Sequence, residues 1–174
     1  MPLFEEHKLF EFLILEGAQA GLAWITVLRK REAYRRAFDN FDPTKMVLYG
    51  ERDRDRLLAN PGIIRNRLKV ESALRNARAY MAMREAGESF GEFLWQFVGK
   101  RPIQNHWQSL SDVPASTPES EAMSKALKQK EFNFVGPTIC YAFMQATGMV
   151  NDHLVSCYRH RDCALAADQQ AFGH

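Results

Sequence analysis

The sequence predicts an all-α protein with one domain, and three observations support this. Apolar residues recur at helical spacing along most of the 174 residues. Residues that cap helices, such as Asp42, Ser89 and Thr117, stand where these stretches begin. No alternating strand pattern of useful length, internal repeat or low-complexity linker interrupts them. Because 46% of the residues are hydrophobic, the chain can bury a core of its own. We therefore expect a single helical bundle over 1–174.

Four helices are expected in the first half of the chain. They lie at 9–15, at 24–41, from Asp42 onward, and from about 70 to Gly87. The first is almost continuously apolar, which predicts a central and largely buried helix. The second carries one apolar stripe, and basic residues at 29–36 fill much of its other surface, where we expect them to be solvated. Pro43 suits the first position of the third helix.

The second half continues the helical pattern after an irregular segment. Ser89 and Glu92 have the spacing of a capping box, so a helix begins there. Residues 100–116 are polar and irregular. Further helices are expected from Thr117 and over about 137–147. The tail at 164–174 carries no interpretable signal, and disorder there is one expectation.

Composition sets limits on the compartment and the partners. The net charge of +2 and the pI of about 8.5 permit nucleic-acid binding without requiring it. No apolar run reaches the roughly 18 residues of a membrane span, and the first residues do not have the pattern of a signal peptide. The three cysteines are an odd number, which indicates thiols or metal ligands in a reducing compartment. We expect a cytoplasmic protein without membrane contact.

Glu16 is the most informative single residue, because it is the only charge between Glu11 and Arg29. Its neighbours are apolar, small or neutral. A carboxylate in such a run is paired, neutralised, or held ready for a cationic or hydrogen-bond-donating ligand. The alternative is a glutamate on the one wet stripe of a buried helix.

The segment 60–69 combines a Pro-Gly turn with the start of a helix. The free backbone N–H groups and the dipole at such a helix start bind phosphate. Arg65, Arg67 and Lys69 would add positive charge on the same side. The alternative is an ordinary turn between helices with solvated basic residues.

His153 and Cys157 are four residues apart, so on a helix they would share one face. Imidazole and thiolate at this spacing can form half of a tetrahedral zinc site. A capped helix end with a free thiol explains the pattern equally well. A cluster that adds His160 and Cys163 is a further alternative.

Four segments together resemble a known family. They are LEGAQAGLAWITVL at 15–28, PGIIRNR at 61–67, FNFVGPTICY at 132–141 and VNDHLVSC at 150–157. In order and spacing, over about 2–161, they resemble the bacterial DNA-3-methyladenine glycosylase I family. The resemblance implies a helix-hairpin-helix DNA glycosylase fold, with the hairpin motif around 57–75. It also implies excision of 3-methyladenine from alkylated double-stranded DNA, by hydrolysis of the N-glycosidic bond after base flipping.

The resemblance assigns roles to individual residues. Glu16 would be the catalytic and base-reading carboxylate, with Trp24 as one wall of the base pocket. Gly21 and Leu22 would form the wedge that fills the gap left by the extruded nucleotide. The DNA-gripping hairpin would comprise Gly62, Ile63, Arg65 and Arg67. His153 and Cys157 would be ligands of a structural zinc ion, and the protein is expected to act as a monomer.

The sequence departs from the family pattern at its start. Members of the family begin with a segment that this sequence lacks, and that segment carries the cysteine and histidine that complete the zinc site. The sequence therefore predicts only half a zinc site, at 153–157. Two hypotheses follow: a glycosylase whose longer form is the active one, or a DNA-binding remnant of the family with little catalysis. A helical scaffold unrelated to DNA is a third.

Overall fold

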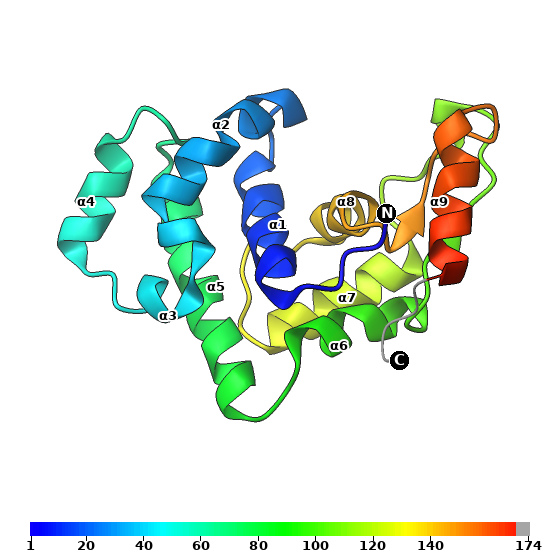
Figure 1. Cartoon of the computed structure of the whole chain (residues 1–174). Coiled ribbons are helices and arrows are strands. Elements are labelled where there is room, and N and C mark those ends of the chain that lie inside the picture. The colour runs from blue at the N-terminus through cyan, green and yellow to red at the C-terminus, as the bar shows by residue number, and fades with distance from the viewer. Residues whose placement is uncertain (170–174) are drawn as a thin grey trace.

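Helices account for most of the chain. The computed structural model describes residues 1–169, apart from the side chains of Trp24, Asp168 and Gln169. The α-helices are α1 (Glu6–Gln19), α2 (Trp24–Ala37), α3 (Pro43–Met46), α4 (Glu51–Ala59), α5 (Arg67–Glu85), α6 (Phe90–Trp95), α7 (Pro118–Gln129), α8 (Pro137–Ala146) and α9 (Tyr158–Gln169). Short 3-10 turns lie at Asp39–Phe41, Gln96–Val98 and Leu110–Asp112. The predicted all-α class is confirmed (Figure 1).

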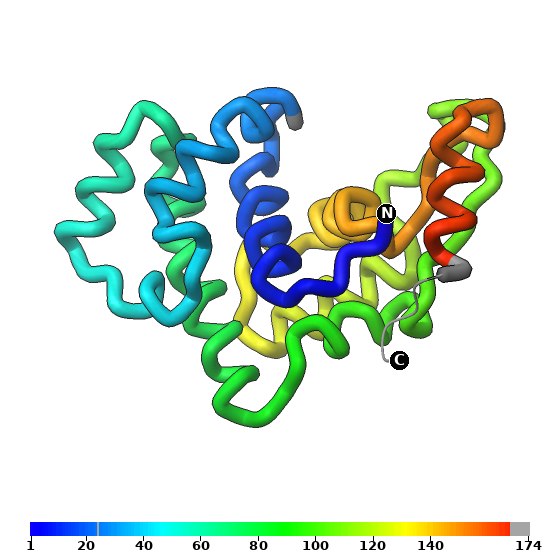
Figure 2. Tube along the Cα trace, in the orientation of Figure 1, coloured from blue at the N-terminus to red at the C-terminus, as the bar shows by residue number. Residues whose placement is uncertain are grey.

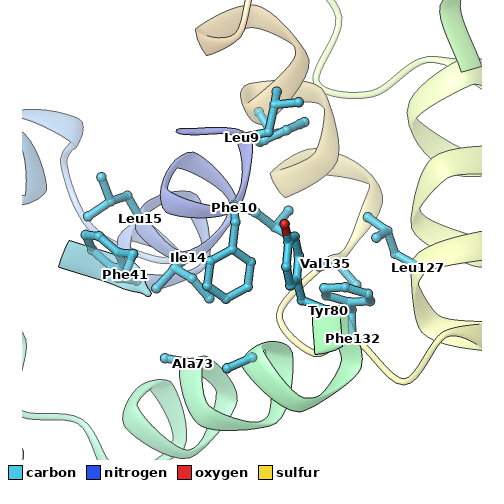
Figure 3. Packing of buried hydrophobic residues seen from close by; sticks show 14 of the residues in the cluster. Leu9, Phe10, Ile14, Leu15, Phe41, Ala73, Tyr80, Leu127, Phe132 and Val135 are labelled. Atoms are coloured by element: carbon cyan, nitrogen blue, oxygen red, sulfur yellow. The ribbon is translucent and has the colours of Figure 1, made fainter. Parts of the chain in front are cut away.

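Helix α1 lies at the centre of the molecule. It packs between the group formed by α2 to α5 on one side and α8 on the other (Figure 1). Its residues from Leu9 to Ala18 are buried apart from Phe12, as the continuous apolar run predicted. The Phe10 ring points from α1 toward Tyr80 of α5 (Figure 3). The ring centroids of Phe10 and Tyr80 are 5.1 Å apart.

The predicted helix at 24–41 ends earlier, at Ala37. Asp39, Asn40 and Phe41 follow with φ of 49°, 57° and 56°, so the chain turns through three consecutive left-handed residues. Aspartate and asparagine tolerate this region, whereas phenylalanine does not favour it. The turn buries the Phe41 ring completely, and Tyr49 donates a hydrogen bond to Asp39 Oδ2 at 2.5 Å. The burial of the Phe41 ring in the core therefore outweighs the unfavourable backbone conformation of this residue.

The cap predicted at Ser89 is present, but the capping box is not complete. Ser89 Oγ accepts a hydrogen bond from the backbone N–H of Glu92 at 3.2 Å. The carboxylate at this helix start belongs to Glu6 of α1, whose Oε1 accepts from the backbone N–H of Gly91 at 3.0 Å and from Ser89 Oγ at 2.5 Å. A distant residue has replaced the local partner, so the predicted role of Glu92 as the returning carboxylate is wrong.

Two strands of two residues each were not predicted, and the first of them lies in the segment 100–116 that the sequence predicted to be irregular. β1 (Ile103–Gln104) pairs in parallel with β2 (Val150–Asn151), with Ile103 opposite Val150. Strands this short leave no alternating pattern to detect. The carboxylate of Asp152, just after β2, accepts hydrogen bonds from Asn105, Trp107, Tyr141 and Gln145. This network ties the β1 segment to α8.

The chain ends differ from expectation in one respect. Residues 164–169 continue α9, so the disorder expected from 164 is not found there, and the rest of that expectation lies outside the described residues.

The first residues run past α8 (Figure 2), where the backbone N–H of Leu3 donates to the carbonyl of Thr147 at 2.9 Å. Within residues 1–169, no helix has both the length and the hydropathy that a bilayer span requires.

Candidate functional site

Glu16 lies in the last turns of α1 and faces a cavity. Only 4% of the residue is exposed. The cavity has a volume of about 230 Å³. Its lining comes from the end of α1, the turn that follows, and one face of α8: Glu16, Gln19, Ala20, Gly21, Leu22, Thr138, Ile139 and Ala142. Pockets for drug-sized ligands measure roughly 300–1,000 Å³, so this one suits a smaller group such as a single base.

The carboxylate of Glu16 has no hydrogen-bond or ion-pair partner among the residues that the structure describes. Burial raises its pKa to about 7, because removal from water disfavours the charged form. Glu16 therefore neither points into open solvent nor binds an internal arginine. Of the three states that the sequence allowed, pairing is not found among the described residues, and the raised pKa means that the carboxyl is partly neutral near pH 7.

Gln19 is a second polar residue of the cavity, and sequence reasoning missed it. Its Oε1 is buried and has no hydrogen-bond partner within the described part of the chain. Gln19 follows Glu16 by three residues, so both side chains lie on the same face of α1. That spacing was the available signal. The lining of the cavity thus includes a carboxyl side chain and an amide side chain.

The turn between α1 and α2 forms the rim of the cavity. Gly21 has a φ of +77°, a conformation that costs other residues energy. The backbone N–H of Leu22 donates to the carbonyl of Gln19 at 2.7 Å, and the Leu22 side chain is 40% exposed. An exposed leucine on this turn, beside the cavity, has a position that suits the wedge role. Trp24 begins α2, but its side chain lies outside the described residues.

The predicted hairpin lies between α4 and α5, and most backbone N–H groups of its turn have acceptors within the protein. The N–H of Gly62 donates to Asn60 Oδ1 at 2.8 Å, that of Ile63 to the carbonyl of Asn60 at 3.4 Å, and that of Ile64 to the Tyr34 hydroxyl at 3.1 Å. The turn's own N–H groups are thus already used, so Gly62 and Ile63 offer no free backbone donor. The Ile63 side chain is 3% exposed and belongs to the core.

The donors that remain stand at the start of α5. Among the described residues, nothing accepts a hydrogen bond from the backbone N–H of Arg65, Arg67 or Leu68, while Asn66 Oδ1 accepts from that of Lys69 at 3.1 Å. Arg65 and Arg67 are exposed beside these groups. The free backbone donors at this end therefore belong to the helix start beside the two arginines, and not to the glycine turn.

Gly62 has a steric role in the hairpin. A Cβ at this position would lie 2.9 Å from the Cβ of Ala33 on α2, closer than such atoms approach each other. Lys30 of α2 also donates from Nζ to the carbonyl of Pro61 at 2.9 Å. The glycine thus lets the turn pack tightly against α2.

The candidate zinc ligands lie elsewhere, on the far side of α8 from α1 (Figure 1). His153 follows β2 in a loop and is exposed, and Cys157 ends that loop before α9. The two residues do not share a helix face, so the spacing argument was wrong. Over residues 1–169 no three histidine, cysteine, aspartate or glutamate side chains gather closely enough to hold a metal ion.

This finding bears on both zinc hypotheses. A structural zinc ion takes four ligands, so His153 and Cys157 do not make a closed site by themselves. The alternative cluster with His160 and Cys163 is not assembled either. His160 instead contacts the carbonyl of Asn105 through Nε2 at 2.7 Å. The half site at His153 and Cys157 stays a prediction.

The geometry defines a helical protein with a pocket for one small group that is positively charged or rich in hydrogen-bond donors. A family model described as methyladenine glycosylase matches residues 1–160, and the chain belongs to this family. The DNA-3-methyladenine glycosylase 1 of Escherichia coli (strain K12) is 52% identical over 157 residues, covering 90% of this chain and 84% of that protein. The DNA-3-methyladenine glycosylase of Haemophilus influenzae is 52% identical over 156 residues, with the same coverage.

Solved structures agree with the sequence comparison. A crystal structure of 3-methyladenine DNA glycosylase I is 52% identical and superposes with a TM-score of 0.89, covering 91% of this chain and 87% of that one. A second structure describes 3-methyladenine recognition by the 3-methyladenine DNA glycosylase I of Staphylococcus aureus. It is 37% identical and superposes with a TM-score of 0.87, covering 91% of this chain and 84% of that one. The fold is therefore that of the family.

Proposed function

We propose that this protein removes 3-methyladenine from alkylated double-stranded DNA by hydrolysing the N-glycosidic bond of a flipped-out nucleotide. The family membership and the names of the relatives support this activity. The observation that carries the proposal is Glu16: a buried carboxylate without a partner among the described residues, at a cavity of base size. A buried carboxyl without a hydrogen-bond partner is costly in either protonation state, and a cationic ligand in the cavity would favour its charged form.

The charge of the lesion accounts for selectivity. A 3-methylated adenine nucleotide is cationic, whereas normal adenine is neutral. A carboxylate about 4 Å from the cation gains about 4 kcal/mol if the effective dielectric constant is near 20. An indole face, the role proposed for Trp24, adds about 0.5–2 kcal/mol. Neutral adenine would leave the Glu16 carboxylate desolvated without a compensating interaction. That free-energy cost would disfavour binding of the normal base.

The same groups suit the chemistry of release. A cationic base is a good leaving group, so strong general-acid catalysis is unnecessary. Positive charge moves from the base to the sugar as the glycosidic bond breaks, and the Glu16 carboxylate would stabilise it electrostatically. Gln19, which also lines the cavity, would contact the edge of the base through its side-chain amide.

DNA would be held around this pocket. We propose that Leu22 enters the gap left by the flipped nucleotide, since an apolar wedge there keeps the helix open. Arg65 and Arg67, with the free N–H groups at the start of α5, would contact a phosphate of the backbone. We further propose a monomer that acts in the cytoplasm. The three free cysteines suit that reducing compartment.

The test measures 3-methyladenine released from methylated DNA by the wild-type chain and by Glu16→Gln. We expect release by the wild type and a loss of at least about 100-fold in the variant, because the neutral amide cannot balance a developing cation. Glu85→Gln, which neutralises an exposed glutamate at the end of α5, is the matched control and should behave like the wild type.

Two outcomes would contradict the proposal. Undiminished release by Glu16→Gln would remove Glu16 from the site. Tight binding of methylated duplex by the wild type without any release of base would instead identify a DNA-binding remnant of the family.

A further inference from the structure

Lys69 differs from the other basic residues of the hairpin segment in the direction of its side chain. The sequence placed it with Arg65 and Arg67 as charge facing a phosphate. In the structure its Nζ donates to the carbonyl of Ala18 at 2.7 Å and to that of Ala20 at 2.7 Å. Desolvation lowers the pKa of Lys69, in agreement with an inward position. Lys69 therefore reaches from the first turn of α5 to the end of α1.

The carbonyls of Ala18 and Ala20 lie at the end of α1 and accept no backbone hydrogen bond from the turn that follows. The carbonyl of Gly17 accepts from the N–H of Ala20 at 3.3 Å, and that of Gln19 accepts from the N–H of Leu22 at 2.7 Å. The last turn of α1 contains no basic residue. Lys69 supplies the missing cation, and both the hydrogen bonds and the helix dipole favour a positive charge at that place.

This contact joins the two parts of the proposed DNA site. The residues between Ala18 and Leu22 line the cavity beside Glu16 and carry the wedge. The backbone N–H of Lys69 is itself held by Asn66 at the start of α5, next to the exposed Arg65 and Arg67. If the start of α5 moved when it bound a phosphate, the Lys69 side chain would transmit that movement to the rim of the cavity.

A second residue on the same face of α5 braces the opposite wall. Asn76 lies seven residues after Lys69, and its side-chain amide donates to the carbonyl of Asn133 at 3.0 Å and accepts from the N–H of Asn133 at 2.7 Å. That loop leads into α8, which carries Thr138 and Ile139 of the cavity. Helix α5 therefore contacts the segments that form both walls.

We propose that Lys69 is a positioning residue that sets the rim of the base pocket and the Leu22 wedge when the start of α5 contacts the DNA backbone. It does not touch the base and does not itself contact a phosphate. This inference rests on the proposed function of the same site.

The test compares Lys69→Met with the wild type in three measurements on the full chain. The first is the kinetics of 3-methyladenine release from methylated DNA, for which we expect kcat to fall about tenfold or more and KM to change little, because small misplacements of reacting groups are costly. The second is the fluorescence of a 2-aminopurine placed beside a stable abasic analogue in a duplex, where the increase on binding should be lost. The third is the salt dependence of binding to undamaged duplex, whose slope should not change.

Two further variants keep the result interpretable. Arg67→Met is the matched charge control, and it should lower the salt slope by about 0.9, the value for one phosphate contact. Lys69→Arg keeps a donor able to reach the two carbonyls and should restore most of the kcat and of the fluorescence increase. A purely structural role would not produce this pattern of rescue together with an unchanged salt slope.

Other results would overturn the proposal. A slope reduced by about 0.9 in Lys69→Met would make Lys69 a phosphate contact. A lower melting temperature with unchanged kcat per folded molecule would make it a stabilising residue only. If the wild type released no 3-methyladenine, the proposed function would fail, yet the fluorescence and salt measurements would still decide whether Lys69 positions the wedge.

Discussion

Helix α1 carries two buried carboxylates in very different surroundings. Glu11 is 3% exposed and Glu16 is 4% exposed. Glu11 Oε1 accepts from Arg31 Nε at 2.7 Å and from Arg35 Nε at 2.9 Å. Glu16 has neither an arginine nor any other partner among the described residues, and its pKa is raised to about 7. One helix thus buries a carboxylate that is satisfied and another that is not.

The comparison teaches that burial alone does not mark a functional carboxylate. Buried polar groups are nearly always paired, and Glu11 follows that rule at the interface of α1 with α2. Glu16 breaks the rule at a cavity, where a ligand can supply what the protein does not. The two residues differ in whether the protein supplies hydrogen-bond and ion-pair partners, and not in their exposed fraction. This difference separates a residue that stabilises the fold from one that we propose to bind a lesion.

The largest expected difference concerns the pH dependence of stability. In the folded protein Glu16 holds its proton up to about pH 7, whereas its ordinary pKa is 4.5. Between these values the folded state binds more protons, so wild-type stability falls as the pH rises, by up to about 3 kcal/mol in total. Glu16→Gln cannot titrate and should lack this loss. Urea unfolding between pH 4.5 and 8.5 should show that the free energy of unfolding of the variant increases relative to that of the wild type as the pH rises. If the two free energies changed with pH in parallel, the raised pKa would be contradicted.

Glu11→Gln should act in the opposite direction. The substitution removes the charge that two arginines bind, so we expect the free energy of unfolding at pH 7 to fall by about 2 kcal/mol. The loss stays below that of a fully buried pair because Arg31 and Arg35 are partly exposed and can regain water. The same urea experiment measures it, and release of base per folded molecule serves as the control. A variant as stable as the wild type would mean that Glu11 contributes nothing.

Much of this contrast was visible in the sequence for Glu16 and little of it for Glu11. A lone charge in an apolar run is a local pattern, and helical periodicity predicted the burial of α1. The partners of Glu11 lie 20 and 24 residues away, on a surface that the pattern predicted to be solvated. That prediction is wrong for Arg31 and Arg35, because the packing of α2 on α1 decides which arginines face inward.

The same limit explains the other differences at the candidate site. Lys69 reaches carbonyls 51 and 49 residues away, and no spacing rule reveals such a contact. Ile63 was assigned to a DNA surface from its motif, although its side chain fills the core. His153 and Cys157 were placed on a helix that begins only at Tyr158. Motifs point to segments of the chain, but the direction of each side chain follows from long-range packing.

The smallest expected effect comes from removing one of the two arginines. Arg31→Met should lower the free energy of unfolding by about 1 kcal/mol, less than Glu11→Gln, because Arg35 still binds the carboxylate through two nitrogens. Methionine also retains part of the contact that the Arg31 guanidinium makes 4.7 Å above the Phe12 ring. Urea unfolding at pH 7 measures the change. If Arg31→Met cost as much as Glu11→Gln, the carboxylate would depend on Arg31 alone, and Glu11 without it would become an unpaired acid like Glu16.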